Sequence, residues 1–553
     1  MKPYLQEGLI INFDVSVEMP YCPKRGAEQK EKTKCGPSCR TPADVFEGRE
    51  EMKEATNRSY NETVEKIKGQ IDSLFMAAFN RFDTGFRAEE GNCDIVPPPS
   101  AGRLHKTLIL TDITTADERD KNKKYVIQRL SLTPFDLEAV EHMFHLLEMA
   151  QEEAESKGAF DRGGVLEGWI RVKYFSLKGG KSKEISGRQV GQKILYEYDE
   201  RGNPLRAWRV MEFVEGKIYE RLAEIGKDEE DEQLRRQYQL KAAMLFGEAI
   251  AKFVVLMNFV PKDAQFMDTL PGFHDTRGYV DEVNDLLAGK KVPVRPGKDT
   301  PKAKMVDGLL DGKYQDGKYT ARVKRMVEIF RGTRPLANAF NGLPANLQRA
   351  VCHGDLKLNN VIWATDEMGN PDHVRCFIDL DTIGVYTALD DFGDAARSMI
   401  NILGEDIWKE GKTLTDIVLD TEVFEKLMEG YLTGINKLCG IFSQGEQQAT
   451  ADQWNVGDLK VYLHRAVALY FFQLGTRFFK AFISELAERA SGDNQRHFVY
   501  FLKQSDADLE DKNLRLAEVQ YTSLARFLKE FREELKLGEL GIKLDDITEP
   551  LGW

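Results

Sequence analysis

Apolar and polar residues alternate at a spacing of two in several short runs between about residue 95 and residue 215. The runs Thr107–Thr111 and Tyr125–Leu130 predict strands, with a charged turn at 116–124 between them. Further strands are predicted at Trp169–Leu177, Lys193–Tyr198 and Trp208–Phe213. A helical pattern at Leu137–Ala154 interrupts them, so this stretch is expected to form a strand-rich unit with one long helix.

After Gly216 the apolar residues recur at a spacing of three to four, which is typical of helices. Helices are predicted at Gln233–Phe259, Asp416–Asn436, Val461–Arg489 and Leu514–Leu535. The pattern therefore predicts an α+β fold with a small β-rich lobe and a larger α-helical lobe, joined near Met211–Gly216.

Two stretches depart from this pattern. Residues 1–70 are expected to form an N-terminal extension, with a helical pattern developing from about Ala43 to Phe82, and residues 289–318, rich in Lys, Gly and Pro, predict a loop or insertion. The expected division is an extension at 1–70, a β-rich lobe at 71–215 and a helical lobe at 216–553.

The length, hydrophobic content and net charge of the chain limit the classes of protein to which it can belong. A chain of 553 residues with 42% hydrophobic content can form two or three packed units, and a net charge of −13 argues against nucleic acid as the main partner. The start of the chain has no apolar secretion signal, and no run of about 18 apolar residues occurs, so a soluble, cytoplasmic protein without a membrane partner is expected.

The seven cysteines are irregularly spaced, which argues against a disulfide framework. Cys22, Cys35 and Cys39 form the only cluster, and a zinc site there would need a fourth ligand, although no His occurs in the first 100 residues. Plain thiols are the alternative to a metal site.

The segment with the most chemical content begins at His353 and reads His-Gly-Asp-Leu-Lys-Leu-Asn-Asn. Phosphoryl transfer needs a carboxylate that orients the attacking hydroxyl, oxygen ligands for a metal, and a cation that offsets charge. Asp355 is predicted to face the acceptor hydroxyl, and Lys357 to reach towards the terminal phosphate. Asn360 is predicted to offer its amide oxygen to Mg²⁺.

A second short segment, Arg375-Cys-Phe-Ile-Asp-Leu-Asp-Thr, completes the pattern. Apolar runs on both sides of a turn at Asp366–Asp372 predict a strand–turn–strand unit that brings Asp355 and Asp379 together. Asp379 is then the main predicted metal ligand. The alternative is an Asn-rich surface turn between two strands, without catalytic function.

These segments resemble the aminoglycoside phosphotransferase and choline kinase superfamily, whose fold is similar to that of protein kinases. The runs Asp-x-Lys-x-Asn-Asn and Ile-Asp-Leu-Asp-Thr most resemble anomeric sugar kinases of the N-acetylhexosamine 1-kinase type. The resemblance extends over about residues 70–480. It implies a two-lobed, protein-kinase-like fold that uses ATP and Mg²⁺ to phosphorylate a small-molecule hydroxyl.

The resemblance also implies a nucleotide site. Ser100 and Gly102 lie in the segment that matches the nucleotide loop, although a Pro-rich turn is the alternative. Arg129, on the strand Tyr125–Leu130, takes the place of the phosphate-binding lysine of protein kinases, with Glu138 or Glu141 to orient it. A strand-end Arg facing water is the alternative there. Backbone groups of Glu212, Phe213 and Val214 would hold the nucleobase.

Three residues are candidate substrate contacts. His274, in Pro-Gly-Phe-His-Asp-Thr, either lines the acceptor site or caps a helix. Asp381 is a second metal ligand or an acceptor contact, and Arg397 either faces the substrate or lies on a helix surface.

The sequence Asp391-Phe-Gly spells the metal motif of protein kinases, but it lies at a predicted helix start, where an Asp is favoured for other reasons. In the family that the chain resembles, an Asp of this element braces the catalytic loop. The resemblance therefore implies that role for Asp391 or Asp394, and Asp379 keeps the metal role.

The expected function is transfer of the terminal phosphate of ATP to a sugar hydroxyl, with the anomeric hydroxyl of a hexose or N-acetylhexosamine as the main hypothesis. The first alternative is a choline, amino-alcohol or aminoglycoside kinase, whose cationic acceptor would need acidic or aromatic walls. Such walls could come from the aromatic residues of the C-terminal half, which are also expected as core: Trp408, Trp454, Tyr462, Tyr470, Phe471 and Phe472. The second alternative is an inactive kinase fold that binds a nucleotide or a partner.

Overall fold

The computed structural model describes residues 72–98, 106–113, 123–261, 263–288, 319–344, 347–405, 407–442, 456–490 and 511–551. All of them belong to one compact unit, Asp72–Trp553. Ser100, Gly102, the cluster Cys22, Cys35 and Cys39, and the predicted insertion 289–318 lie outside the described residues.

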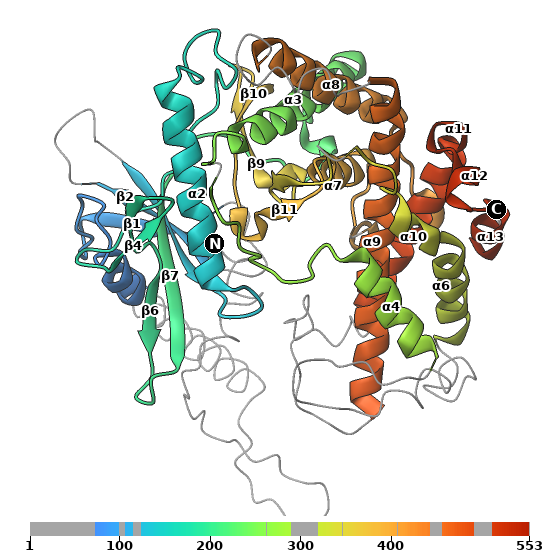
Figure 1. The fold of residues 1–553 in the computed structure, drawn as a ribbon, viewed down its shortest axis with the longest axis horizontal. Helices are drawn as coiled ribbons and strands as arrows, with labels where there is room; N and C mark the ends of the chain where they lie inside the picture. Colours follow the sequence, from blue (N-terminus) through green and yellow to red (C-terminus); the bar gives the residue numbers. More distant parts are fainter. Residues whose placement is uncertain are drawn as a thin grey trace, which may run out of the picture. The chain divides into compact units, whose positions relative to one another are not determined.

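A five-stranded antiparallel sheet forms the first part of this unit (Figure 1). Its strands, in spatial order, are β1 (Cys93–Val96), β2 (Lys106–Asp112), β3 (Lys124–Leu130), β7 (Pro204–Glu212) and β6 (Leu195–Tyr198). Four of them, β2, β3, β6 and β7, confirm strands expected from the alternating pattern. The described strands and helices confirm the predicted α+β class.

The two faces of the sheet have different partners. Phe75 and Phe79, on the helical residues 72–79, pack against Trp208 and Tyr125, with ring centroids 4.9 and 5.1 Å apart. The helix α2 (Leu137–Ser156) covers the other face, where its Phe144 ring lies 5.1 Å from the Arg209 guanidinium. The helix starts where predicted because the Asp136 carboxylate accepts the N–H groups of its first turn.

The connection from α2 to β6 differs from the prediction. The expected strand Trp169–Leu177 is wrong, since this stretch makes only isolated bridges, such as Tyr174 to Met211. Trp169 and Tyr174 are buried by packing rather than by strand pairing, so tertiary contacts override the local strand preference. A hairpin that was not predicted follows, formed by β4 (Ser182–Ile185) and β5 (Arg188–Gly191).

Helices dominate the second part, as predicted. They are α3 (Glu232–Met257), α4 (Thr276–Leu287), α6 (Thr320–Thr333), α7 (Asp390–Ile400), α8 (Thr421–Phe442), α9 (Val456–Ala490), α10 (Lys512–Glu530), α11 (Arg532–Leu535), α12 (Leu537–Leu540) and α13 (Asp545–Thr548). Short 3₁₀ turns lie at Leu222–Glu224, Arg334–Asn338, Ile407–Glu410, Leu414–Asp416 and Glu549–Leu551. No helix among the described residues is long and apolar enough to cross a membrane.

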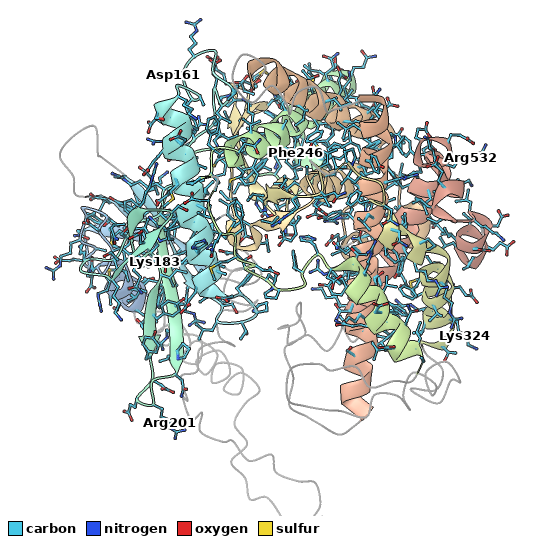
Figure 2. All side chains as sticks on the ribbon, viewed as in Figure 1. Asp161, Lys183, Arg201, Phe246, Lys324 and Arg532 are labelled. Atoms are coloured by element: carbon cyan, nitrogen blue, oxygen red, sulfur yellow. The ribbon has the colours of Figure 1, made fainter. Side chains whose placement is uncertain are left out.

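Close packing of α3 and α8 fixes the centre of this helical part (Figure 1). The two helices meet at Gly247 and Gly430, where a Cβ atom would lie 2.0 and 1.9 Å from a backbone carbonyl oxygen of the other helix. Phe246, labelled in Figure 2, lies 6.2 Å from both Trp363 and Phe377. The core of α3 therefore extends directly onto the strands that carry the predicted catalytic segments.

Candidate active site

Four short strands hold the two predicted catalytic segments. They are β8 (Ala350–Cys352), β9 (Val361–Thr365), β10 (Pro371–Phe377) and β11 (Gly384–Tyr386). β9 pairs with β10 and β8 pairs with β11, both antiparallel. The predicted strand–turn–strand unit is therefore confirmed. The Ile378 N–H donates to the Asn360 carbonyl at 2.9 Å, so the segment before β9 lies beside the segment after β10.

Asp355 forms an ion pair with Lys357 in the loop between β8 and the 3₁₀ turn Leu358–Asn360. Lys357 Nζ donates to Asp355 Oδ2 at 2.7 Å. Burial acts to raise the pKa of Asp355, but the charge and hydrogen bond of Lys357 outweigh it, so the pKa lies below its ordinary value. Asp355 is thus held as an ionised acceptor.

Asp391 braces this loop from the start of α7. Its two carboxylate oxygens accept the backbone N–H groups of His353 and Gly354, at 2.7 and 3.0 Å. The supporting role predicted for Asp391 or Asp394 is confirmed for Asp391. Burial raises the pKa of Asp391 to about 6.

Glycine is the one residue type that fits position 354 of the loop. Its φ is +83°, and an added Cβ would lie 2.3 Å from the Thr382 carbonyl oxygen. Thr382 Oγ1 in turn donates to the His353 carbonyl at 2.9 Å. These contacts fix the loop of Asp355 against the turn that follows Asp379.

His353 links the same two segments through a defined tautomer. Its Nε2 faces the Ile378 carbonyl oxygen at 2.8 Å, and that oxygen can only accept, so Nε2 carries a proton. Its Nδ1 accepts the Asp355 N–H at 3.3 Å. The buried imidazole therefore links the segment of Asp355 to the segment before Asp379.

Asn360 and Asp379 have the geometry of candidate metal ligands. Asn360 Nδ2 donates to the Asp355 carbonyl at 2.7 Å, which leaves its side-chain oxygen as the atom for a cation. Asp379 is exposed and has a left-handed backbone, with φ 62° and ψ 48°, which is uncommon outside glycine and enriched in Asp and Asn. Strain of this kind often accompanies functional sites.

The donor set fits a nucleotide-bound Mg²⁺ better than a protein cage. No cluster of three or more His, Cys, Asp or Glu able to hold a metal occurs among the described residues. Mg²⁺ commonly takes one or two protein oxygens and completes its shell with phosphate and water. Asn360 and Asp379 would supply those protein oxygens.

Asp381 is a partner of Arg209 and is not available as a ligand. The buried Asp381 carboxylate accepts two hydrogen bonds from Arg209 of β7, one of them Nη2 to Oδ2 at 2.8 Å. Arg209 Nε also donates to Gln128 Oε1 at 2.6 Å. The predicted role of Asp381 as a second metal ligand or acceptor contact thus gives way to that of an anchor for the Asp379 turn.

Arg129 lies on the other face of the sheet. β3 pairs in continuous register, Gln128 opposite Arg209 and Arg129 opposite Trp208. Since neighbouring residues of a strand point to opposite faces, Arg129 lies on the Trp208 side, away from Asp381. The prediction is off by one residue: Gln128 and Arg209 occupy the face towards the catalytic segments.

The two candidate partners of Arg129 also lie elsewhere. Glu138 is exposed in the first turn of α2, and Glu141 is buried. Glu141 Oε1 accepts the backbone N–H of Ile194 at 2.7 Å. Its carboxylate therefore supports the connection to β6.

His274 contacts the catalytic loop. Its Nε2 lies 2.6 Å from the Gly354 carbonyl oxygen, and its Nδ1 lies 3.2 Å from Gln473 Oε1 and 3.3 Å from the Tyr470 hydroxyl. The N-cap of α4 is Asp275, whose side chain accepts from Gly278, so the alternative that His274 caps the helix is wrong.

Arg397 is buried between two carboxylates. It donates to Asp394 at 2.7 and 3.0 Å and to Glu405 at 2.7 Å. The alternative of an exposed position on a helix surface is therefore wrong, and the substrate contact of Arg397 stays a prediction. Burial and the charge of Asp355 raise the pKa of Asp394, although Arg397 acts against them.

The predicted nucleobase segment is only partly available. The N–H groups of Glu212 and Phe213 donate to the carbonyls of Lys173 and Lys124, at 3.0 and 3.2 Å. Of the three predicted residues, Val214 is the one whose N–H makes no backbone hydrogen bond within the described chain. Recognition of the nucleobase by backbone groups of Glu212, Phe213 and Val214 therefore stays a prediction, with the Val214 N–H as its candidate donor.

Comparison with known proteins agrees with this chemistry. Residues 186–411 match the family model described as the phosphotransferase enzyme family. The match covers about two fifths of the chain and includes Asp355, Asn360, Asp379 and Asp391. Over this segment the chain is similar to that family, and the class of enzyme is a phosphotransferase.

Solved structures are similar at a lower level. A choline kinase from Cryptosporidium parvum Iowa II is 10% identical, with a TM-score of 0.41, over 85% of this chain and 99% of that chain. The amicoumacin kinase hAmiN, in complex with AMP-PNP, Ca²⁺ and Ami, is 11% identical, with a TM-score of 0.40, over 85% of this chain and 96% of that chain. Similarity this distant carries no argument about the acceptor.

Proposed function

We propose that this protein transfers the terminal phosphate of ATP to a hydroxyl group of a small, uncharged acceptor, with the anomeric hydroxyl of a hexose or N-acetylhexosamine as the main hypothesis. The observation that carries the proposal is the arrangement around Asp355. Its carboxylate is ionised by Lys357 and lies in a loop braced by Asp391, and that loop is bonded to the turn that follows Asp379.

In the proposed reaction, the acceptor oxygen forms a bond to the terminal phosphorus while the bond from that phosphorus to the bridging oxygen of ADP breaks. Asp355 orients the hydroxyl and takes its proton as the new bond forms. A pKa below the ordinary value makes Asp355 a weak base, which suits a loose transition state in which the proton leaves late. Bound Mg²⁺ would neutralise charge on the phosphates, with Asn360 and Asp379 as its protein ligands.

The charges near the loop favour a neutral acceptor. Asp394 and Glu405 are both paired with Arg397, and Asp390 accepts from Tyr470 at 2.9 Å. A cationic acceptor such as choline or an aminoglycoside would need carboxylates that are not already paired.

Three of the six aromatic residues considered as walls for such an acceptor belong to the core of the described chain. Tyr470, Phe471 and Phe472 are buried in the core, whereas Trp454 lies outside the described residues. The comparisons by themselves favour neither a sugar nor a cationic acceptor, so the acceptor has to be decided by experiment.

The test is a screen for ADP release with ATP and Mg²⁺ over hexoses, N-acetylhexosamines, choline, amino alcohols and aminoglycosides. Phosphorus NMR of the product then identifies the hydroxyl that was phosphorylated. The proposal expects the highest kcat/KM with an uncharged sugar and a sugar 1-phosphate as product.

Asp355→Asn and Asp379→Ala are expected to lower turnover by at least about 100-fold. Asp372→Asn, which changes an exposed carboxylate on the same hairpin, is the matched control and should retain it. Preference for choline or an aminoglycoside would overturn the neutral-acceptor part. Nucleotide binding without turnover on any acceptor would favour the inactive kinase fold.

A further inference from the structure

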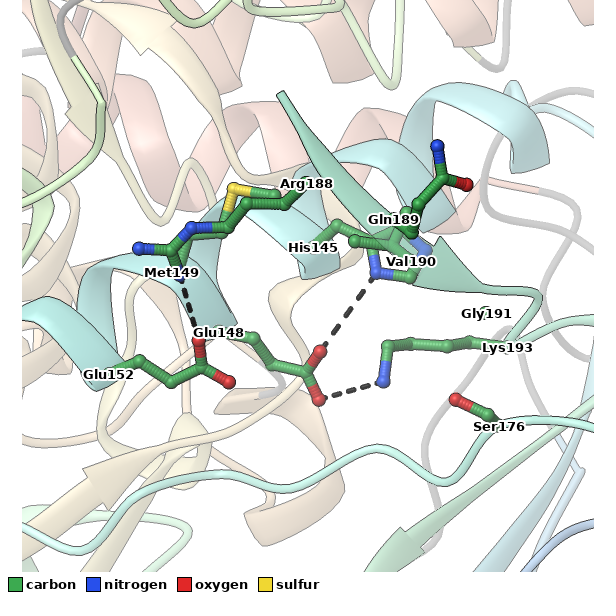
Figure 3. A pocket seen from close by; sticks show the side chains of 10 residues that line it. All are labelled: His145, Glu148, Met149, Glu152, Ser176, Arg188, Gln189, Val190, Gly191 and Lys193. Atoms are coloured by element: carbon green, nitrogen blue, oxygen red, sulfur yellow. Dashed lines mark hydrogen bonds and ion pairs between the residues drawn. The ribbon is translucent and has the colours of Figure 1, made fainter. Parts of the chain in front are cut away.

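A polar pocket lies away from the catalytic segments, between α2 and the β4–β5 hairpin (Figure 3). It has a volume of about 200 Å³. One wall is formed by His145, Glu148 and Glu152, which follow one another along one stripe of α2. The other wall comes from the connection between α2 and β6. The pocket shares no lining residue with the site around Asp355.

His145 is the group that points to a ligand. It is only 1% exposed, and neither ring nitrogen has a hydrogen-bond partner among the described residues. Its Nδ1 lies 3.9 Å from Glu148 Oε2, the contact drawn as a dashed line in Figure 3, which is within the range of an ion pair but too long for a hydrogen bond. A buried polar group without a hydrogen bond costs about 1–3 kcal/mol of stability. Such groups are therefore rare in native proteins, and each one needs an explanation. Burial lowers the pKa of His145, which leaves the neutral ring with one donor and one acceptor.

The charged residues of the pocket are balanced in two pairs. Lys193 Nζ donates to Glu148 Oε1 at 2.7 Å and to the Tyr174 carbonyl at 2.9 Å. Arg188 Nη1 donates to Glu152 Oε2 at 2.8 Å. Each pair keeps further hydrogen-bonding capacity: the second carboxylate oxygens, the third proton of Lys193 and the remaining guanidinium protons. Figure 3 shows both pairs facing the same space.

This balance limits the class of ligand. A ligand with a net charge would bring an unmatched charge beside the largely buried Lys193–Glu148 pair, whose charges already cancel, and the exposed Arg188–Glu152 pair at the rim is balanced as well. No aromatic side chain other than His145 is among the lining residues, so a flat or ring-shaped ligand would find no stacking surface. The space is also smaller than pockets that hold drug-sized molecules, about 300–1,000 Å³. A small molecule with separate positive and negative groups meets all three conditions.

We propose that this pocket binds a small zwitterion of the free amino-acid type. Glu148 and Glu152 receive its ammonium group, and Lys193, Arg188 and the Ser176 hydroxyl receive its carboxylate. His145 supplies one further donor and one further acceptor. The short aliphatic part of the ligand would contact Met149 and Val190, the apolar residues of the lining.

The position of the pocket gives binding a possible consequence for the enzyme. Phe144, next to His145 on α2, stacks on Tyr174 at 4.1 Å and lies 5.1 Å from the Arg209 guanidinium. Arg209 holds Asp381 and, through it, the turn of Asp379. A ligand that shifts α2 would therefore act on a helix that contacts the anchor of this turn.

The experiment observes the pocket directly. The full chain, labelled at the methionine methyl groups, is titrated with glycine, L-alanine and L-serine, and the signal of Met149 is identified by its loss in Met149→Leu. Acetate, ethylammonium and glycerol serve as an anion, a cation and a neutral polyol. We expect a saturable shift of the Met149 signal with at least one amino acid at millimolar concentration and none with the other three probes.

His145→Phe keeps a flat ring but removes both nitrogens, so the shift should weaken at least tenfold in affinity. His142→Phe, on the same helix but outside the pocket lining, is the matched control and should leave it unchanged. Ser176→Ala provides a second variant if His145→Phe does not fold, and should also weaken binding. A Met149 signal that no amino acid shifts would overturn the site. An equal shift with acetate, ethylammonium or glycerol alone would overturn the zwitterion.

Discussion

The buried ion pair of Arg209 and Asp381 leads to a prediction that distinguishes two roles of Asp381, an anchor for the Asp379 turn and a metal ligand. Asp381→Leu leaves the Arg209 guanidinium, about 2% exposed, without its carboxylate. Removal of one partner of a buried ion pair costs about 3–5 kcal/mol. Because Gln128 still accepts from Arg209 Nε at 2.6 Å, we expect the lower end, about 3 kcal/mol. Replacement of both partners by apolar residues of similar volume is often close to neutral. Arg209→Met combined with Asp381→Leu should therefore recover most of the loss.

The assay is denaturant unfolding of the wild type, both single variants and the double variant, analysed as a double-mutant cycle. The KM for Mg²⁺ of the double variant is measured alongside, and we expect it to rise because the Asp379 turn loses its charged anchor. The reasoning is refuted if Asp381→Leu has wild-type stability. It is also refuted if the double variant is no more stable than Asp381→Leu alone.

Three further predictions concern the catalytic loop. The Asp391 carboxyl, with its pKa raised to about 6 by burial, accepts two backbone N–H groups fully only when ionised. We expect kcat/KM to rise with pH through about 6 and Asp391→Asn to remove that step from the pH–rate profile. The contribution of this carboxyl to stability changes with pH in the opposite direction to kcat/KM. Because its pKa in the folded protein lies above the ordinary 3.8, the free energy of unfolding falls as the pH rises from 3.8 to about 6. Gly354→Ala should lower the free energy of unfolding by at least about 1–2 kcal/mol, because an Ala at φ +83° is strained and its Cβ would meet the Thr382 carbonyl; wild-type stability in denaturant would contradict this. His274→Phe loses the hydrogen bond to the Gly354 carbonyl and should lower kcat about tenfold, with an unchanged KM for ATP. Tyr470→Phe keeps that hydrogen bond and serves as the comparison. An unchanged kcat in His274→Phe would argue against a positioning role.

The catalytic segments were predictable because their residues are close in sequence. Asp355, Lys357 and Asn360 lie within one loop, and the apolar runs beside them predict the pair β9 and β10 that brings Asp379 near. In these segments the catalytic residue types and the strand pattern of the flanking residues lead to the same prediction, and the structure adds the distances and orientations of the side chains. Bracing by Asp391 or Asp394 was also predicted, from the family resemblance, and the structure assigns it to Asp391.

The supporting contacts were harder to predict because they join distant parts of the chain. Arg209 and Asp381 are 172 residues apart, and no local pattern links them. A signal did exist, since Arg209 is a charged residue between the apolar Trp208 and Val210 of a central strand. Such a position needs a buried partner.

The error at Arg129 has a different cause. A strand exposes alternate residues, so a shift of one position exchanges the two faces. Gln128 and Arg129 are neighbours on the strand, and the resemblance to the kinase strand assigns the phosphate-binding position to Arg129. The register of β3 with β7 shows that Gln128 is the residue on the catalytic side.

The central claim is that Asp355 carries phosphoryl transfer, and single-turnover kinetics tests it most directly. The labelled terminal phosphate of ATP is followed to the best acceptor, or to water where no acceptor is found, for the wild type and Asp355→Asn. We predict that transfer slows by about 10²–10⁴-fold in Asp355→Asn while the affinity for ATP is unchanged. Transfer within a few-fold of the wild-type rate would contradict the account.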